Sequence, residues 1–197
     1  MNVNQKKRIY EKLNNKRIEM LQDFINNINL KATASEIAKK RNLNQKSTSL
    51  FFKELEKQTI LKSLTQGKNK LYFLNKESKL LIHFISIIEN LITIEFYKKH
   101  TKIKYLAEKI LPKINDTAII FGSYTKNKQK TNSDIDLLIV GDYDKSIEKD
   151  AELFNLTLDI KHYNKLRKDT LIEEVKKNHV ILKGTETFIQ LNLENQI

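Results

Sequence analysis

The feature that most constrains this 197-residue chain is a pair of carboxylates at an apolar run. Residues 135–140 read Ile-Asp-Leu-Leu-Ile-Val, and Asp134 comes directly before them. Such a run indicates a buried strand, and a carboxylate on a buried strand needs a partner or a metal ion. Side chains two apart on a strand share a face, so Asp134 and Asp136 are predicted to point the same way.

A second apolar run ends at Phe121 and leads directly into Gly122 and Ser123. Glycine lets the backbone turn sharply and approach a phosphate, because it has no Cβ. Serine offers a hydroxyl and a backbone N–H at the start of a predicted helix, where phosphates bind. Mg²⁺ bound by neighbouring carboxylates and nucleotide phosphates would relieve the repulsion between the carboxylates. The alternative, a plain turn followed by surface carboxylates, is disfavoured by the apolar neighbours of Asp136.

Ten residues lie between Ser123 and Asp134, which gives the pattern GS-x10-D-x-D. This pattern resembles the signature of minimal nucleotidyltransferases in the DNA polymerase β superfamily, and the resemblance covers about residues 116–183. It implies transfer of a nucleoside monophosphate, such as AMP from ATP, to a hydroxyl group with release of pyrophosphate. It also implies two Mg²⁺ ions that hold the attacking and leaving oxygens.

A third strand is predicted at residues 156–161, where Leu and Ile alternate with polar side chains. Asp159 lies on its polar face. Superfamily members carry a third acidic residue on such a strand, so the resemblance implies that Asp159 binds an ion or helps to deprotonate the acceptor. A surface carboxylate on an edge strand is the alternative. The implied triphosphate-binding residues are Gly122, Ser123 and Tyr124, and the implied catalytic metal ligands are Asp134, Asp136 and Asp159.

The upstream part of the chain resembles a winged helix-turn-helix domain over about residues 16–75. A capping box at residues 33–36 begins one short helix, a second helix is predicted at residues 45–57, and a basic hairpin follows. The resemblance implies that the second of these helices enters the major groove of double-stranded DNA. The implied DNA-binding residues are Gln45, Lys46, Ser49 and Lys53 in the helix and Lys68 and Lys70 in the wing. Winged helices also mediate protein contacts, which is the alternative.

The net charge of +12 is unevenly distributed. Residues 1–115 carry 24 Lys and Arg against 10 Asp and Glu, whereas residues 116–197 carry 12 against 14. A basic half favours nucleic-acid binding, although a solvated lysine-rich surface would give the same count. The chain has no cysteine, which excludes disulfide and thiolate chemistry. The polar, basic N-terminus and the charged residues within the longest apolar stretch, 80–97, predict a cytoplasmic protein without a membrane span.

These observations predict an α+β chain in three parts. Residues 1–76 would form the winged helix-turn-helix DNA-binding domain, residues 77–115 linking and dimerisation helices, and residues 116–197 a mixed-sheet nucleotidyltransferase domain. Residues 77–100 are apolar on more than one face, which predicts burial between domains or in a homodimer.

Two functions are compatible with this architecture. The first is Mg²⁺-dependent nucleotidyl transfer to a hydroxyl of a protein or RNA acceptor, in an autoregulated antitoxin-type protein with a toxin-like partner. The second is a DNA-binding transcriptional regulator whose nucleotidyltransferase domain only binds nucleotide.

Overall fold

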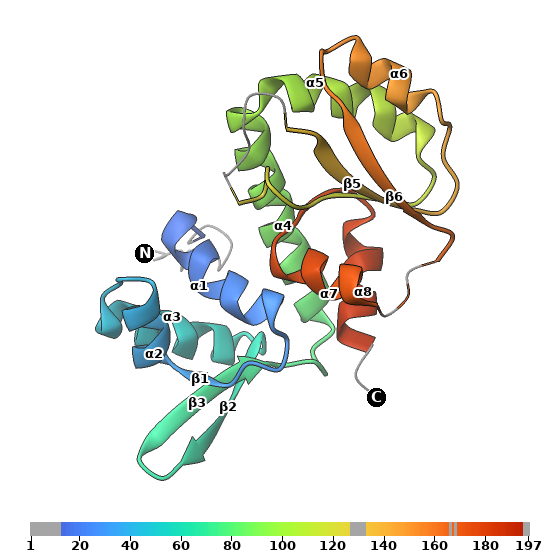
Figure 1. Cartoon of the computed structure of the whole chain (residues 1–197). Coiled ribbons are helices and arrows are strands. Elements are labelled where there is room, and N and C mark those ends of the chain that lie inside the picture. The colour runs from blue at the N-terminus through green and yellow to red at the C-terminus, as the bar shows by residue number, and fades with distance from the viewer. Residues whose placement is uncertain (1–12, 127–132, 166, 168, 195–197) are drawn as a thin grey trace, which may run out of the picture. The chain divides into compact units, whose positions relative to one another are not determined.

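The computed structural model describes residues 13–126, 133–165, 167 and 169–194 (Figure 1). The chain divides into two compact units, Met1–Ile87 and Ile88–Ile197.

The first unit contains a small antiparallel sheet and short helices. Its elements before the long helix α4 are α1 (Asn15–Asn26), β1 (Ala32–Thr33), α2 (Ala34–Lys40), α3 (Gln45–Lys57), β2 (Leu61–Gln66) and β3 (Asn69–Leu74). The strand order is β1-β3-β2. These elements follow the order predicted from the sequence, with β1 as an addition, and their assignment to a winged helix-turn-helix domain stays a prediction.

Polar caps begin each of these helices, as the sequence predicts for α2. Asn14 and Asn44 each accept a backbone N–H bond at the start of α1 and α3. Thr33 and Glu36 form the predicted capping box of α2, with bonds of 3.1 and 2.7 Å. The caps satisfy N–H groups that would otherwise lack partners, which fixes where each helix starts.

The core of the first unit is aromatic. The ring of Phe52 meets the rings of Phe24 and Tyr72 edge-on, at centroid distances of 5.6 and 5.3 Å. These residues come from α3, α1 and β3, so one ring cluster holds two helices to the sheet. The buried Asp23 of α1 forms ion pairs with two basic residues at the end of α2, Lys40 and Arg41.

Helix α4 (Leu80–Lys99) is the long apolar helix that the sequence predicts at about residues 76–100. The division between the two units falls within it. Among the described helices it alone is long and apolar enough to cross a membrane, a weak indication because buried core helices share both properties. In the second unit α4 makes polar contacts with the sheet, since the Thr93 hydroxyl donates a 2.8 Å hydrogen bond to the carbonyl of Ile181.

The second unit is built on a four-stranded mixed sheet. Its further elements are α5 (Thr101–Ile110), the 3₁₀ helix η2 (Leu111–Lys113), β4 (Thr117–Ile120), β5 (Ile135–Val140), α6 (Ile147–Glu152), β6 (Leu158–Tyr163), α7 (Thr170–Lys177), β7 (Val180–Lys183) and α8 (Thr185–Glu194). The strand order is β6-β5-β4-β7; β5 and β6 are parallel, and the other pairs are antiparallel. The predicted α+β class and mixed sheet are therefore confirmed.

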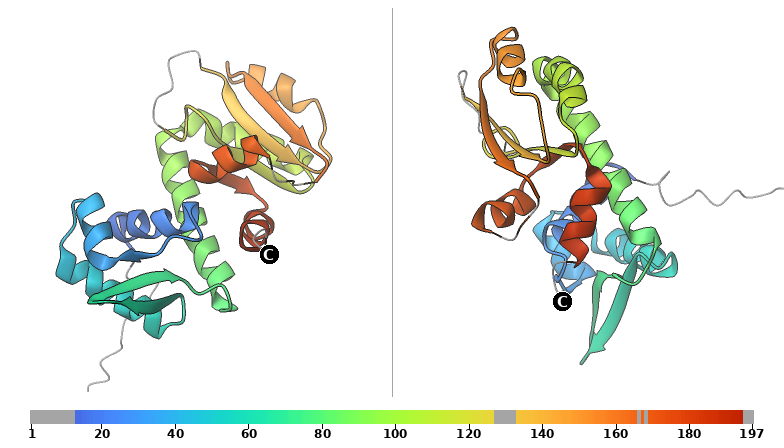
Figure 2. Two further views of the ribbon diagram at one scale, coloured as in Figure 1. Left: turned by 60° about the horizontal axis from the view of Figure 1, so that its bottom comes forward. Right: turned by 90° about the vertical axis from the view of Figure 1, so that its right-hand side faces the viewer.

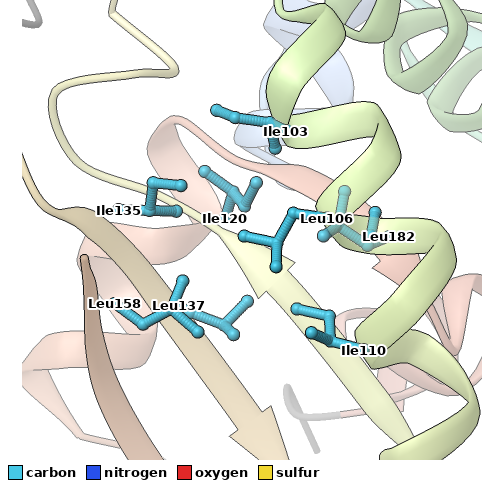
Figure 3. Close-up of a pocket in the computed structure, with 9 residues that line it drawn as sticks. Ile103, Leu106, Ile110, Ile120, Ile135, Leu137, Leu158 and Leu182 are labelled. Carbon is cyan, nitrogen blue, oxygen red and sulfur yellow. The ribbon is translucent and has the colours of Figure 1, made fainter. Parts of the chain in front are cut away.

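Both faces of this sheet are covered, as two further views show (Figure 2). On one face Ile135, Leu137 and Ile139 pack with the apolar residues of α5. A small pocket between α5 and the sheet is lined only by aliphatic side chains (Figure 3). On the other face Leu138 and Val140 pack with α7 and α8. Asp136 lies between Ile135 and Leu137 along β5, so its side chain projects from this second face, as those of Leu138 and Val140 do.

Three local predictions from the sequence are wrong. The segment after Ser123 forms turns through Lys126 rather than a helix, and residues 127–132 lie outside the described part. Strand β6 begins at Leu158, two residues after the predicted start. The polar, charged pattern of residues 142–152 predicts surface carboxylates there, but Asp150 is buried and pairs with Lys109 and Lys113 at 3.1 and 2.6 Å. This ion cluster connects α6 to α5 and η2.

Candidate active site

The strand directions gather the predicted site residues at one end of the sheet. β4 runs antiparallel to β5, and β5 runs parallel to β6. The end of β4 therefore lies beside the beginnings of β5 and β6. The backbone N–H of Phe121 donates a 3.0 Å bond to the carbonyl of Asp136, which carries the β4–β5 pairing up to the Gly-Ser turn.

Gly122 lies against the carboxylate of Asp136. Its φ of +73° belongs to the left-handed region that side chains disfavour. A Cβ at this position would lie 2.6 Å from Asp136 Cγ and closer still to Oδ2. Glycine is thus required for two reasons: the turn needs a left-handed backbone, and the Asp136 carboxylate occupies the place where a side chain of residue 122 would lie.

Asp136 and Asp159 lie opposite one another on the parallel strands β5 and β6. Both are partly buried, and the side chain of Asp159 is 44% exposed. The two carboxylates share one face of the sheet, because Leu158 and Ile160, the neighbours of Asp159 along β6, pack toward α5 on the opposite face.

A basic side chain joins this acidic pair. Lys161 Nζ lies 2.9 Å from Asp159 Oδ1. The hydrogen bond and charge of Asp159, together with the charge of Asp136, raise the pKa of Lys161. Lys161 lies on the polar face that the sequence predicts for residues 156–161, and the alternation along this strand is the signal that could have pointed to it.

Asp134 and Tyr124 flank the turn. Asp134 is exposed and directly precedes β5. Tyr124 is buried, and its hydroxyl donates a 3.2 Å bond to the carbonyl of Ser133. Burial and the nearby charge of Asp134 raise the pKa of Tyr124. Ser123 is half-buried. Tyr124 therefore anchors the turn in the core, while Ser123 and Asp134 stay accessible to a ligand.

Hydrogen bonds of Thr125 also stabilise the Gly-Ser turn. The Thr125 hydroxyl donates to the carbonyl of Gly122 at 3.0 Å and approaches the carbonyl of Asn178 at 3.4 Å. The side chain of the next residue, His179, is buried. Its Nε2 atom lies 3.5 Å from Glu89 Oε2, and its Nδ1–H donates a hydrogen bond to the carbonyl of Val175 in α7. This pair is not predicted from the sequence, because no spacing pattern connects residues 90 positions apart.

The donor set suits a hard divalent cation such as Mg²⁺, which prefers carboxylate oxygens. Gly122 leaves room for the Asp136 carboxylate, and a cationic group already contacts Asp159. In the described part of the chain, no three acidic or histidine side chains gather closely enough to hold a metal ion. The assignment of Asp134, Asp136 and Asp159 as a ligand set thus stays a prediction. The aliphatic pocket beside α5 offers no polar group for a nucleotide.

The residues predicted to bind DNA occupy α3 and the β2–β3 hairpin of the first unit. On α3, Gln45, Lys46 and Lys53 are exposed and Ser49 is half-buried. Lys68 is exposed in the hairpin turn, and Lys70 is exposed on β3. Lys70 forms an ion pair of 2.7 Å with Glu56. Phosphate binding by Lys70 would have to compete with that carboxylate.

Comparison with known proteins bears on the second unit. No curated protein and no solved structure matches the chain. Residues 101–187 match the family model described as polymerase beta, nucleotidyltransferase. The matched segment begins with α5, includes all of β4, β5, β6 and β7, and ends within α8. The match supports placing this segment, which carries the acidic pair and the Gly-Ser turn, in the nucleotidyltransferase superfamily.

Proposed function

We propose that the second unit transfers a nucleoside monophosphate, probed first as AMP from ATP, to a hydroxyl group of a protein or RNA acceptor with the help of Mg²⁺. One observation carries the proposal: Asp136 and Asp159 lie opposite one another on β5 and β6, and Gly122, which has no side chain, leaves room for the Asp136 carboxylate. The family match gives independent support for nucleotidyltransferase chemistry in general.

Each group would have a definite task. Two bound Mg²⁺ ions would supply electrostatic stabilisation of the charge that develops on the phosphoryl oxygens. Asp134, Asp136 and Asp159 would hold these ions. Gly122 lets the backbone approach the triphosphate, and Ser123 offers it a hydroxyl and an N–H.

The bond changes follow from the substrate classes. The acceptor oxygen forms a bond to the α-phosphorus, and the bond from that phosphorus to the pyrophosphate oxygen breaks. The proton of the acceptor hydroxyl passes to Asp159, which is 44% exposed and thus reachable from solvent. Pyrophosphate leaves with the electron pair of the broken bond.

The test uses the four nucleoside triphosphates labelled at the α-phosphate, Mg²⁺, and separate protein and RNA fractions of a cell lysate as acceptors. We expect label in one fraction, abolished by EDTA. Asp136→Asn should lower transfer by roughly 10²–10³-fold, since a metal ion contributes several kcal/mol of transition-state stabilisation.

Asp142→Asn is the matched control for this substitution, because it neutralises an exposed carboxylate just beyond the other end of β5. It should leave transfer unchanged. Transfer by Asp136→Asn at the wild-type rate would overturn the proposal. Labelling of a single protein that co-purifies with the chain would favour the antitoxin-type role over RNA modification.

A second candidate function has its own supporting observation. Lys46, Lys53 and Lys68 are exposed on α3 and the hairpin of a unit whose chain segment is strongly basic. We propose that this unit is a winged helix-turn-helix domain that binds double-stranded DNA, whether or not the second unit is catalytic. Selection of duplexes from a random pool tests it. A regulator without catalysis would enrich a sequence and bind nucleotide, yet transfer no label.

Two further parts of the proposal concern assembly and location. Leu80, Ile87 and Ile94 of α4 are exposed large apolar residues, which favours a homodimer through residues 77–100. Sedimentation of the full chain should give the mass of a dimer, and Ile94→Glu should give a monomer. We place the protein in the cytoplasm, which fractionation of cells expressing the tagged full chain would test.

A further inference from the structure

We propose that Lys161 is the counter-ion of the acidic pair, Asp136 and Asp159, before a metal ion binds. A divalent cation displaces Lys161 from Asp159, and the freed ammonium group of Lys161 then binds the polyphosphate of the nucleotide. The inference rests on the proposed function, because it requires a divalent cation and a nucleotide polyphosphate at the acidic pair.

The position of Lys161 is fixed by the sheet. It follows Asp159 by two residues on β6, so both side chains project from the same face. The parallel register pairs Asp136 with Asp159 and Leu138 with Lys161. Lys161 is thus the next residue on the same face of β6 after Asp159, and Asp159 lies opposite Asp136 on β5. The Lys161 Nζ atom lies 2.9 Å from Asp159 Oδ1.

The ion pair between Lys161 and Asp159 can be broken easily, so that another cation can replace Lys161. The side chains of Lys161 and Asp159 are 46% and 44% exposed, so water screens their attraction and can solvate either group when they separate. Lysine carries a compact charge on a flexible stem, which can turn to a new anion without moving the strand. A divalent ion carries twice the charge and competes for the same carboxylate oxygen.

Another lysine near the turn is less suited to this role. Lys126 follows the Gly-Ser turn but lies 3.6 Å from Glu174 on α7, a carboxylate outside the acidic pair. Release of Lys161 from Asp159, by contrast, is coupled to metal binding. The nucleotide brings negative phosphates to the same metal, so the displaced ammonium group finds an anionic partner close by.

The experiment measures two affinities of opposite expected sign on the full-length chain. The first is the affinity for Mn²⁺ alone, followed by electron paramagnetic resonance. The second is the affinity for inorganic tripolyphosphate in saturating Mg²⁺, followed by calorimetry, which does not depend on the nucleotide base. In Lys161→Met, Mn²⁺ should bind about two- to fivefold more tightly, because the competing cation is gone. Tripolyphosphate should bind about three- to tenfold more weakly.

Two control variants separate charge from structure. Lys161→Arg keeps the positive charge and should restore both affinities to within about twofold of wild type. Lys145→Met removes an exposed lysine elsewhere in the second unit and should change neither. If Lys161→Met only disturbs the structure, the affinities for Mn²⁺ and for tripolyphosphate should both fall. That result would overturn the inference.

The other outcomes are also decisive. Unchanged affinities in Lys161→Met, with nucleotidyl transfer intact in wild type, would refute the role of Lys161 and leave the proposed function standing. If neither wild type nor variant binds Mn²⁺ or Mg²⁺-tripolyphosphate, both proposals fail. Opposite shifts of the two affinities support the inference even where no acceptor has been identified.

Discussion

At the scale of single residues, Gly122 links backbone conformation to the acidic pair. Gly122→Ala must strain a backbone at φ +73° and push the Asp136 carboxylate aside. We expect loss of about 1–2 kcal/mol of stability from the left-handed conformation and, in addition, weaker Mn²⁺ binding and loss of nucleotidyl transfer. Denaturant unfolding, Mn²⁺ titration and the labelling assay measure the three effects.

Gly67→Ala is the control for that substitution. Gly67 has a similar φ of +60°, but nothing lies within 4 Å of the Cβ that alanine would add. It should show the stability loss alone, with metal binding and transfer unchanged. Wild-type transfer by Gly122→Ala would contradict the close approach of Asp136 to the turn.

The buried pair of Glu89 and His179 predicts a pH dependence of stability. Burial lowers the pKa of His179, but the charge of Glu89 and the hydrogen bonds outweigh it, so the net pKa is raised. The folded state thus holds the proton more tightly. This stabilisation is fully present below the unfolded pKa of about 6.5 and is lost as the pH rises through the folded value.

Unfolding experiments between pH 5.5 and 9 on wild type and His179→Gln test this. The stability advantage of wild type should shrink as the pH rises above about 6.5, with each unit of pKa elevation worth about 1.4 kcal/mol. The exposed His162 offers a control, since His162→Gln should track wild type. An advantage that grows with pH would show that His179 is neutral in the folded protein.

How far the site could be predicted depends on the kind of contact. Asp159 could be assigned to the polar face of its strand from the sequence, because the two-residue period of a strand is local. The contact of Lys161 with Asp159 depends on a side-chain rotamer, which alternation does not specify. Glu89 and His179 meet only because α4 packs beside β7, and no local pattern reports such a tertiary contact.

At the scale of secondary structure, the capping box of α2 is the local signal with the clearest consequence. Thr33→Ala removes the bond to the N–H of Glu36 and should destabilise α2 by about 1 kcal/mol. Amide hydrogen exchange of residues 34–40 should accelerate, while α3 is less affected. Thr101→Ala, in the first turn of α5, is the control, because no side-chain cap bond forms there. Unchanged exchange in α2 would contradict the cap's contribution.

The elements show where sequence patterns stop being sufficient. α3 and β5 have the predicted bounds, since the Asn44 side chain caps the start of α3 and an unbroken apolar run from Leu137 carries β5 to its end at Val140. β1 has only two residues, too few for any periodicity, and exists because β3 offers it a partner. Leu156 and Thr157 continue the alternation of β6 without being strand, since the ladder with β5 begins at Leu158.

At the scale of the whole molecule, the two units differ in charge and in what supports their assignment. The family match falls entirely within the second unit, which contains the acidic pair. The basic excess of the sequence falls upstream of residue 116. The acidic pair and the basic excess thus lie in separate parts of the chain, and so do the two functions proposed for them. Because the two units are compact by themselves, substitutions in one unit should test its proposed function without changing the other unit.

DNA binding by the first unit should weaken as the salt concentration rises, because proteins that bind phosphates release counterions from the duplex. The logarithm of the affinity for a random 20-base-pair duplex should fall linearly with the logarithm of the salt concentration. Replacing the exposed Lys46 and Lys53 by alanine should reduce the slope by about two, one for each phosphate that is no longer neutralised. Replacing Lys145 and Lys149, which are exposed in the second unit, removes the same charge and should leave the slope unchanged. Equal slopes for both double variants would mean that net charge, rather than α3, attracts the duplex, and the winged-helix proposal would then lack support.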